Sequence, residues 1–146
     1  YMESFDIPHT YTPQMVVNGR YEGTGSNPFS VHSMMGKAAD EPLPEIPAVL
    51  KGSELKLSLP DRGGGDIVRI ILAGFDSSHT ETIGSGENGG KKVTYVNAMT
   101  MLENIGLWDG TAVEITYGIA KPAENYVVLL QHGGGALAGA SKVLKP

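Results

Sequence analysis

Apolar and polar residues alternate with a period of two along much of the chain after residue 48, and this pattern predicts a β-rich fold. Residues 54–59 alternate strictly, which places Leu55, Leu57 and Leu59 on one face. Further apolar runs predict strands at 67–75, 80–83, 112–117, 125–131 and 136–144. Short glycine-rich or polar segments separate these runs, as in a sandwich or a small barrel-like sheet.

The stretch at 93–105 fits two kinds of element. It follows a polar glycine-rich loop at 84–92. Residues 93–101 alternate imperfectly, which favours a strand, whereas Met99, Leu102 and Ile105 recur at helical spacing. The pattern leaves both alternatives open.

The beginning of the chain has a different pattern, which predicts a hairpin followed by a helix. Residues 15–17 form a short apolar run, and Asn18-Gly19 after it is typical of a tight hairpin turn. Residues 20–23 are then the returning strand. We predict a helix over roughly 28–39, since Ser26 or Asn27 can cap its free N–H groups and Pro28 suits its first turn.

Prolines mark a boundary between these two parts. Three of them fall between Glu41 and Pro47, which favours an extended, semi-rigid connector. The sequence therefore predicts three segments: a first unit at 1–40, a proline-rich linker at 41–48 and a β-sandwich-like domain at 49–146.

Composition limits the classes of function. The chain has 146 residues, enough for one domain or for one compact domain plus part of another. The net charge of −5 and the small number of clustered basic residues argue against a nucleic-acid partner. No apolar run approaches the ~20 residues of a membrane-spanning helix. The absence of cysteine excludes disulfides, a thiolate nucleophile and cysteine-ligated zinc within this sequence.

Most candidate chemical motifs do not have the residue spacing that their chemistry requires. The loop Gly84–Lys92 resembles a phosphate loop but lacks the hydroxyl residue that would hold magnesium. The histidines at 9, 32, 79 and 132 are far apart, so we predict no metal site, and we expect no cofactor. Ser77 or Ser78 lies near Asp76 and His79, but adjacency in sequence does not make a catalytic triad. Trp108, between two glycine turns, is more typical of a core residue than of a sugar- or peptide-binding aromatic.

Three longer segments resemble one bacterial family. They are H-T-Y-T-P-Q-M-V-V-N-G-R-Y-E-G-T-G-S-N at 9–27, G-E-N-G-G-K-K-V-T-Y-V-N-A-M-T-M-L-E-N-I-G-L-W-D-G at 86–110 and V-L-L-Q-H-G-G-G-A-L-A-G-A at 128–140. In this order they are similar to segments of the secreted domain-of-unknown-function 1223 family. Members of that family resemble thioredoxin in their first half and are β-rich in their second.

The resemblance implies a fold and a groove. It implies an α+β chain that begins with the C-terminal half of a thioredoxin-like fold, a β-hairpin and a helix, followed by a β-rich sandwich-like domain. Thr12-Pro13 would correspond to the thioredoxin cis-proline, and Thr12, Pro13, His9 and Tyr11 become candidates for a substrate groove. Glu87 and Asn88 are characteristic of the family's glycine loop.

The resemblance also implies an absent half and a compartment. Family members carry a cysteine-bearing loop before the T-P-Q segment, and this sequence has none. We therefore expect a protein partner, or an N-terminal segment, that completes the thioredoxin-like sheet. The family's secreted character implies a periplasmic or secreted location.

Three functional hypotheses follow. The first is a non-catalytic binding or accessory structural module. The second is part of a thiol-disulfide redox protein whose cysteine-bearing half is on a missing or separate segment. The third is a ligand-binding β-sandwich with Trp108 and the loop of Glu87 and Asn88 at its mouth.

Overall fold

The computed structural model describes residues 5–7, 9 and 11–144. Residues 1–4, 8 and 10 of the predicted first unit and residues 145–146 of the predicted β-sandwich-like domain lie outside the described residues. The elements are β1 (Gln14–Val17), β2 (Tyr21–Thr24), α1 (Pro28–Asp40), β3 (Ala48–Lys51), β4 (Glu54–Leu59), β5 (Val68–Thr82), β6 (Lys92–Trp108), β7 (Val113–Gly118), β8 (Asn125–Gln131) and β9 (Leu137–Lys142). The chain is thus sheet-dominated, with one helix in the part that the structure describes.

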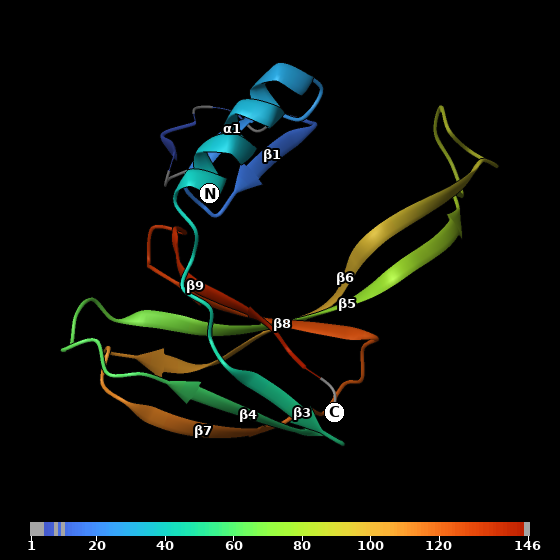
Figure 1. Ribbon diagram of the computed structural model, residues 1–146. Coiled ribbons are helices and arrows are strands. Elements are labelled where there is room, and N and C mark those ends of the chain that lie inside the picture. Colours follow the sequence, from blue (N-terminus) through green and yellow to red (C-terminus); the bar gives the residue numbers. More distant parts are fainter. Residues whose placement is uncertain (1–4, 8, 10, 145–146) are drawn as a thin grey trace.

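Two antiparallel sheets face each other in the larger part of the molecule (Figure 1). One has the order β3-β4-β7 and the other β6-β5-β8-β9. A cluster of buried side chains lies between them and includes Leu55, Leu57, Ile70, Leu72 and Leu130, each with no exposed surface. The strict alternation at 54–59 is therefore confirmed as a strand with its leucines in the core.

The hairpin and the helix form at the predicted positions. β1 pairs with β2 in antiparallel register, and both Asn18 and Gly19 have the positive φ that such a turn requires. Asn27 is the N-cap residue: its side-chain oxygen accepts hydrogen bonds from the backbone N–H groups of Phe29 (3.1 Å) and Ser30 (3.3 Å).

The helix packs on the hairpin through a narrow contact. Met34 is the buried residue of α1, and it lies with Ser30 beside Gly23 of β2. Glycine at this position leaves the room that the helix needs, because a Cβ there would come within 2.9 Å of the Ser30 hydroxyl. Figure 1 shows the hairpin and α1 together on one side of the four-stranded sheet.

The proline-rich linker is extended, as predicted, but it is not a free spacer. Glu45 forms a parallel bridge with Ala140 of β9. The Ile46 N–H donates to the Ala140 carbonyl (3.3 Å), and the Ala140 N–H donates to the Pro44 carbonyl (3.2 Å). Ile46 is fully buried. The linker therefore runs along the edge of β9, where Ile46 anchors it in the core.

The ambiguous stretch at 93–105 is a strand throughout. β6 pairs with β5 from Lys92 to Trp108. The register shifts between Ile70 and Ile71 and again between Gly74 and Phe75. Bulges of this kind insert an extra residue and reverse the facing of the side chains, which explains why the alternation looked imperfect.

Two further boundaries differ from the sequence prediction. Residues 80–83 are not a separate strand, because β5 continues without a break from Val68 to Thr82. The second half of β5 is polar and has no apolar run that would predict a strand. Its strand conformation is stabilised by pairing with β6. The pattern also missed β3 (Ala48–Lys51), which is short and directly follows the proline-rich segment.

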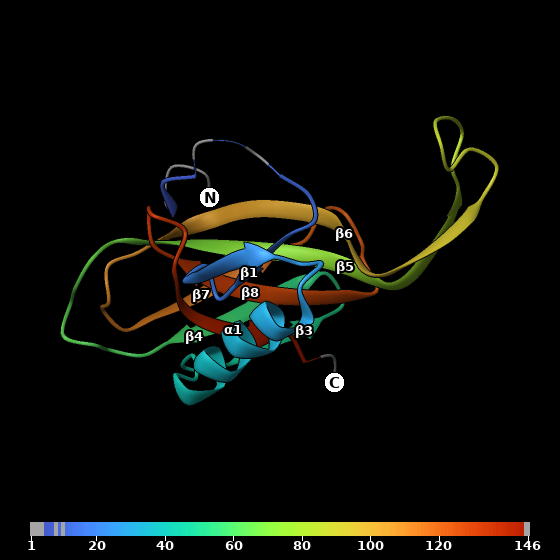
Figure 2. The ribbon, with the colours of Figure 1, turned by 90° about the horizontal axis from the view of Figure 1, so that it is seen from above.

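β5 and β6 extend past the end of their pairing with β8 and leave the sheet as a two-stranded arm. β8 pairs with β5 only from Arg69 to Phe75, whereas β6 follows β5 to Thr82. We call residues 76–98 the arm. Figures 1 and 2 show it projecting from the body of the molecule.

The hairpin turn rests on the loop between β8 and β9. The backbone N–H of Leu137 donates to the Asn18 carbonyl (2.9 Å), and the Arg20 guanidinium donates to the Leu137 carbonyl (3.0 Å). Arg20 also contacts Glu41 at 3.3 Å. A side chain at Gly19 would clash with the carbonyl oxygen of Gly135. This turn and the linker join the hairpin and helix to the sandwich.

Candidate functional site

The residues predicted to line a groove lie directly before the start of β1. The Thr12–Pro13 peptide bond is cis, and Pro13 directly precedes the strand. The Pro13 carbonyl accepts a hydrogen bond from the Gly25 N–H at 2.7 Å, so the entrance to β1 is fixed against the end of β2. Tyr11, Thr12 and Pro13 are all exposed, and His9 is exposed ahead of them.

Polar side chains link this entrance to β2. The Tyr11 hydroxyl donates to the Glu22 carboxylate, and the Gln14 amide donates to the same carboxylate oxygen at 3.1 Å. These contacts order Tyr11 beside the hairpin. The exposed backbone and the hydrogen-bonding side chains are groups of the kind that contact an extended polypeptide.

α1 exposes two large apolar side chains. Phe29 is 88% exposed and Met35 is 58% exposed, and Pro28, Phe29 and His32 line a shallow apolar hollow. The His32 ring nitrogen Nδ1 lies 2.8 Å from the Pro28 carbonyl. Because an α-helix has about 3.6 residues per turn, Phe29 and Met35 lie on different sides of α1, and the apolar hollow is confined to the first turn.

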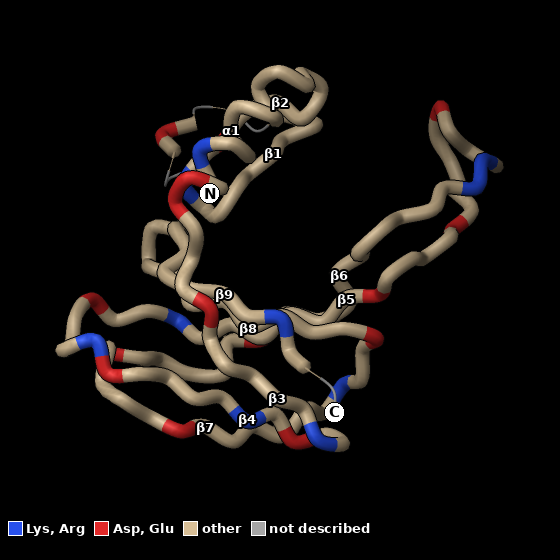
Figure 3. The backbone as a smooth tube through the Cα atoms, in the orientation of Figure 1, with Lys and Arg blue, Asp and Glu red and all other residues tan. Residues whose placement is uncertain are grey.

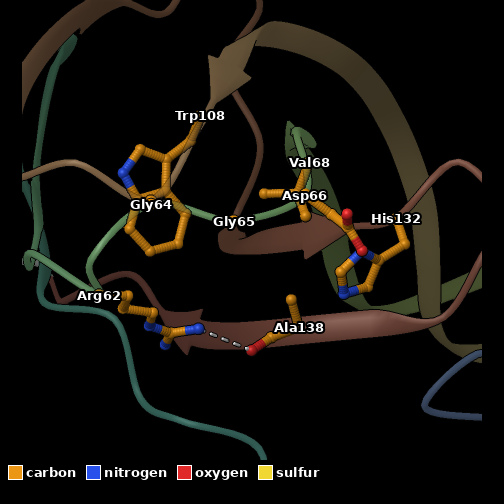
Figure 4. Close-up of a pocket in the computed structure, with 9 residues that line it drawn as sticks. Arg62, Gly64, Gly65, Asp66, Val68, Trp108, His132 and Ala138 are labelled. Atoms are coloured by element: carbon orange, nitrogen blue, oxygen red, sulfur yellow. Dashed lines mark hydrogen bonds between the residues drawn. The ribbon is translucent and has the colours of Figure 1, made fainter.

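A second candidate site is a cavity at one end of the sandwich (Figure 4). It measures about 160 Å³ and is lined by Arg62, Gly64, Gly65, Asp66, Val68, Trp108, Gly110, His132 and Ala138. The Arg62 guanidinium lies 5.1 Å from the centre of the Trp108 ring and donates to the Ala138 carbonyl at 3.4 Å. Asp66 and His132 also line the cavity (Figure 4).

The cavity is lined by polar and charged groups as well as apolar ones. Its lining includes a cation, a carboxylate and an imidazole but no hydroxyl, thiol or amine nucleophile. Three separate segments build it, because the glycine turn at 61–65, the end of β6 and the β8–β9 loop meet here. Arg62 and Asp66 belong to one short loop, but His132 comes from a distant segment, so no local motif predicts that the three line one cavity.

Trp108 belongs to the core and also forms one wall of this cavity. It is 4% exposed, and its indole N–H donates to the Thr111 carbonyl at 2.6 Å. The prediction that Trp108 is a core residue is thereby confirmed. The neighbouring Asp109 accepts hydrogen bonds from the Thr111 hydroxyl and backbone N–H, which lower the pKa of its carboxyl group.

The third sequence hypothesis needed Trp108 and the loop of Glu87 and Asn88 at one mouth, and the structure does not bring them together. Trp108 ends β6 in the body of the molecule, whereas the loop lies at the tip of the arm, before β6 begins. The Asn88 side chain accepts from the Lys91 ammonium at 2.9 Å, and the Asn88 carbonyl accepts from the Lys91 N–H at 3.1 Å. Asn88 thus stabilises its own loop.

The four histidines lie on separate elements. His9 precedes β1, His32 is on α1, His79 is on the arm and His132 is in the β8–β9 loop. Within the described ranges, no three histidine, aspartate or glutamate side chains gather closely enough to hold a metal ion.

The residues around His79 do not form a triad. The Asp76 carboxylate accepts from the Glu124 N–H at 3.4 Å, and the Ser77 hydroxyl accepts from the Asn125 amide at 2.9 Å. Ser78 and His79 are neighbours on a strand, so they point to opposite faces. These contacts attach the base of the arm to the segment before β8.

Comparison with known proteins gives a family and a fold. Residues 1–131 match the family described as "Protein of unknown function (DUF1223)". None of the curated proteins matches this chain. A solved structure is similar in fold: the X-ray crystal structure of protein AGR_C_4864 from Agrobacterium tumefaciens, with 23% sequence identity and a TM-score of 0.77. The similarity covers 99% of this chain but only 66% of that one.

The family match supports only part of what the resemblance implied. It supports the family, while the assignment of this chain to the C-terminal half of family members and the thioredoxin-like character of its first unit stay predictions. In the part of the chain that the structure describes, no helix has the length and apolar character needed to cross a membrane. With a family match over residues 1–131, this chain belongs to the DUF1223 family of proteins of unknown function.

Proposed function

We propose that this chain is a non-catalytic binding or accessory module of the bacterial periplasm, and that its hairpin and helix complete a thioredoxin-like sheet carried by another polypeptide segment. The observation that carries the proposal is the small sheet β1-β2. It has only two strands, and β1 has no second partner strand among the described residues. The periplasmic location rests on the resemblance to secreted proteins.

Physical reasons favour an additional strand beside β1. A two-stranded sheet is marginal in water, and an open strand edge exposes unpaired N–H and C=O groups. Here α1 covers the hairpin through the single buried side chain Met34. A strand added to the free edge would satisfy the backbone groups of β1, as in other cases of β-augmentation.

The length of the solved relative supports a larger assembly. About a third of the Agrobacterium protein has no counterpart in this chain, since the similarity covers 66% of it. That share is large enough to supply strands and a helix.

The alternative function is a role in thiol-disulfide exchange. Any thiolates would lie on the other segment, because this chain has no cysteine. The exposed residues Tyr11, Thr12 and Pro13, with His9, would then line the groove beside β1 and bind the backbone of the substrate.

Hydrogen exchange in the native protein tests the proposal. The protein would be purified from a periplasmic extract of its source bacterium, and the amides of Gln14–Val17 compared with those of the 146-residue chain alone. We expect these amides to exchange roughly tenfold more slowly in the native assembly, since pairing protects an edge strand. β4 (Glu54–Leu59) is the internal control and should not change.

Equal exchange of β1 in both samples, or a native protein that consists of this chain alone, would refute the proposal. If the native assembly contains a reactive cysteine pair, a dithiol-reduction assay separates the two functions. Activity that falls in the Pro13→Ala variant supports the redox alternative, and unchanged activity removes the groove role of Pro13.

A further inference from the structure

The middle strands of the four-stranded sheet are apolar on both faces. Ile70 and Leu72 of β5 and Val128 and Leu130 of β8 point into the core. The residues between them, which lie on the opposite face, are also apolar: Ile71, Ala73 and Phe75 on β5, Val127 and Leu129 on β8. An antiparallel sheet with one solvated face normally has polar residues there, so this composition is typical of a sheet covered on both sides.

Pairing places these outward residues side by side. Ala73 is 7% exposed, and the other four are half-buried. Ala73 lies opposite Val127, and Ile71 lies opposite Leu129. On the other side of β5, Ala73 also lies opposite Leu102 of β6, which is 58% exposed. We call this surface the outer face.

The arm extends the outer face. Phe75 lies opposite both Asn125 of β8 and Met99 of β6, so Met99 is on the outer face as well. Four residues after Phe75, the alternation along β5 places His79 on the same face, and His79 pairs with Tyr95. Met99 is 62% exposed and Tyr95 is 46% exposed.

The opposite face of the arm is more polar. There Thr80 and Thr94 bond to each other through their hydroxyl groups at 2.9 Å, and Ser78 pairs with Val96. Figure 3 shows that acidic and basic residues of the arm lie at its base and towards its tip. Residues 93–102 of β6 contain no charged side chain. Charged residues border the outer face, with Lys142 of β9 opposite Val127 and with Arg69 and Glu81 towards the two ends of β5. An apolar centre with a charged rim suits contact with protein.

The outer face and the hairpin that contains β1 lie on the same side of the four-stranded sheet. The hairpin and α1 lie above the four-stranded sheet, and the arm rises from the sheet towards that side (Figure 1). The hairpin touches the sandwich at its turn, through Asn18, Gly19 and Arg20.

We infer that the outer face, extended by the arm, binds the same polypeptide segment that adds its strand to β1. The inference rests on the proposed function and names a second contact surface for that partner. The partner's chemistry follows from the surface: a folded segment that presents an apolar layer to the centre of the outer face. One body can meet both surfaces because they face the same side, and the unmatched third of the Agrobacterium relative has the size for it.

Single-cysteine variants test this inference cleanly because the chain has no cysteine of its own. Met99→Cys places a thiol on the outer face, and Val96→Cys is the matched control on the opposite face of the same strand. The two side chains are similarly exposed, at 62% and 73%. Tyr95→Cys repeats the test at a second outer-face position.

The measured quantity is the rate of maleimide labelling at each position, located by peptide mass spectrometry. Each variant is compared in the native assembly and in the 146-residue chain alone. We expect roughly tenfold slower labelling at positions 99 and 95 in the assembly, with no change at position 96, since a packed interface excludes the reagent.

Other outcomes separate the two proposals. If β1 is protected from hydrogen exchange in the assembly but positions 99 and 95 label as fast as in the chain alone, the second contact surface is refuted and the proposed function stands. If β1 is not protected, both fail. If position 99 becomes protected in the chain alone as its concentration rises, a second copy of the chain is the occupant and the inference is wrong.

Discussion

At the scale of single residues, two glycines show that the effect of adding a side chain depends on the position of the glycine. Gly19 has φ +63°, and a Cβ there would collide with the carbonyl oxygen of Gly135. Gly36 lies inside α1, with nothing within 4 Å of the place where its Cβ would be. The first glycine is required by a turn and a close approach, whereas the second only adds backbone freedom to a helix.

We predict opposite effects of alanine at these two positions. Gly19→Ala should lower the free energy of unfolding by roughly 1–3 kcal/mol, because it strains the turn and separates it from the β8–β9 loop. Gly36→Ala should raise the stability of α1 by about 0.5–1 kcal/mol, since alanine is the better helix former. Urea denaturation followed by circular dichroism measures both, and a change of the same sign in both variants would contradict the explanation.

At the scale of elements, β5 is one strand with two environments. From Arg69 to Phe75 it lies between β6 and β8, and from Asp76 onward β6 is its partner. The first half has buried side chains, and the residues from Ser77 to Thr82 are all exposed. The same strand therefore combines a rigid half in the body and a weakly supported half in the arm.

Hydrogen exchange of the 146-residue chain should reveal this difference within one strand. We expect amides of the arm at 77–82 to exchange on the order of 100-fold faster than those at 69–74, because local opening of a two-stranded ribbon exposes no core. The inner half of β5 is the control for the outer half. Equal protection along the whole strand would mean that the arm is stabilised by contacts other than its pairing with β6.

At the scale of the whole molecule, the hairpin and helix are held to the sandwich by a few polar contacts and the linker. Arg20 is central to them, since its guanidinium binds the Leu137 carbonyl at 3.0 Å and the Glu41 carboxylate at 3.3 Å. Ile46 anchors the linker in the core. The attachment is therefore specific but involves little apolar surface outside the linker.

Arg20→Ala should loosen this attachment without unfolding the sandwich. Loss of a charged hydrogen bond costs about 1–2 kcal/mol when the partner stays partly solvated. The Leu137 amide, which donates to the Asn18 carbonyl, should exchange roughly tenfold faster as a result. Arg69→Ala is the matched control, because Arg69 donates to Gln131 within the sheet. Faster exchange of Leu137 in both variants would show a general destabilisation instead.

Local patterns in the sequence were sufficient wherever the structure is built from neighbouring residues. Strict alternation put Leu55, Leu57 and Leu59 in the core, because a strand with one buried face must alternate. The Asn18-Gly19 turn and the Asn27 cap followed from backbone geometry and from hydrogen bonds within a few residues. The family was also accessible from the sequence, through segments distributed along the chain.

Only the tertiary structure could decide what distant segments do together. The helical spacing in 93–105 was misleading because pairing with β5 and a bulge, not local preference, fixed β6 as a strand. The cavity of Arg62, Trp108 and His132 depends on three segments meeting at one end of the sandwich. Apolar residues on both faces of β5 and β8 were visible as plain hydrophobic runs, but a run alone does not say which face is covered. That answer required the strand register, because register assigns each side chain to the core or to the outer face.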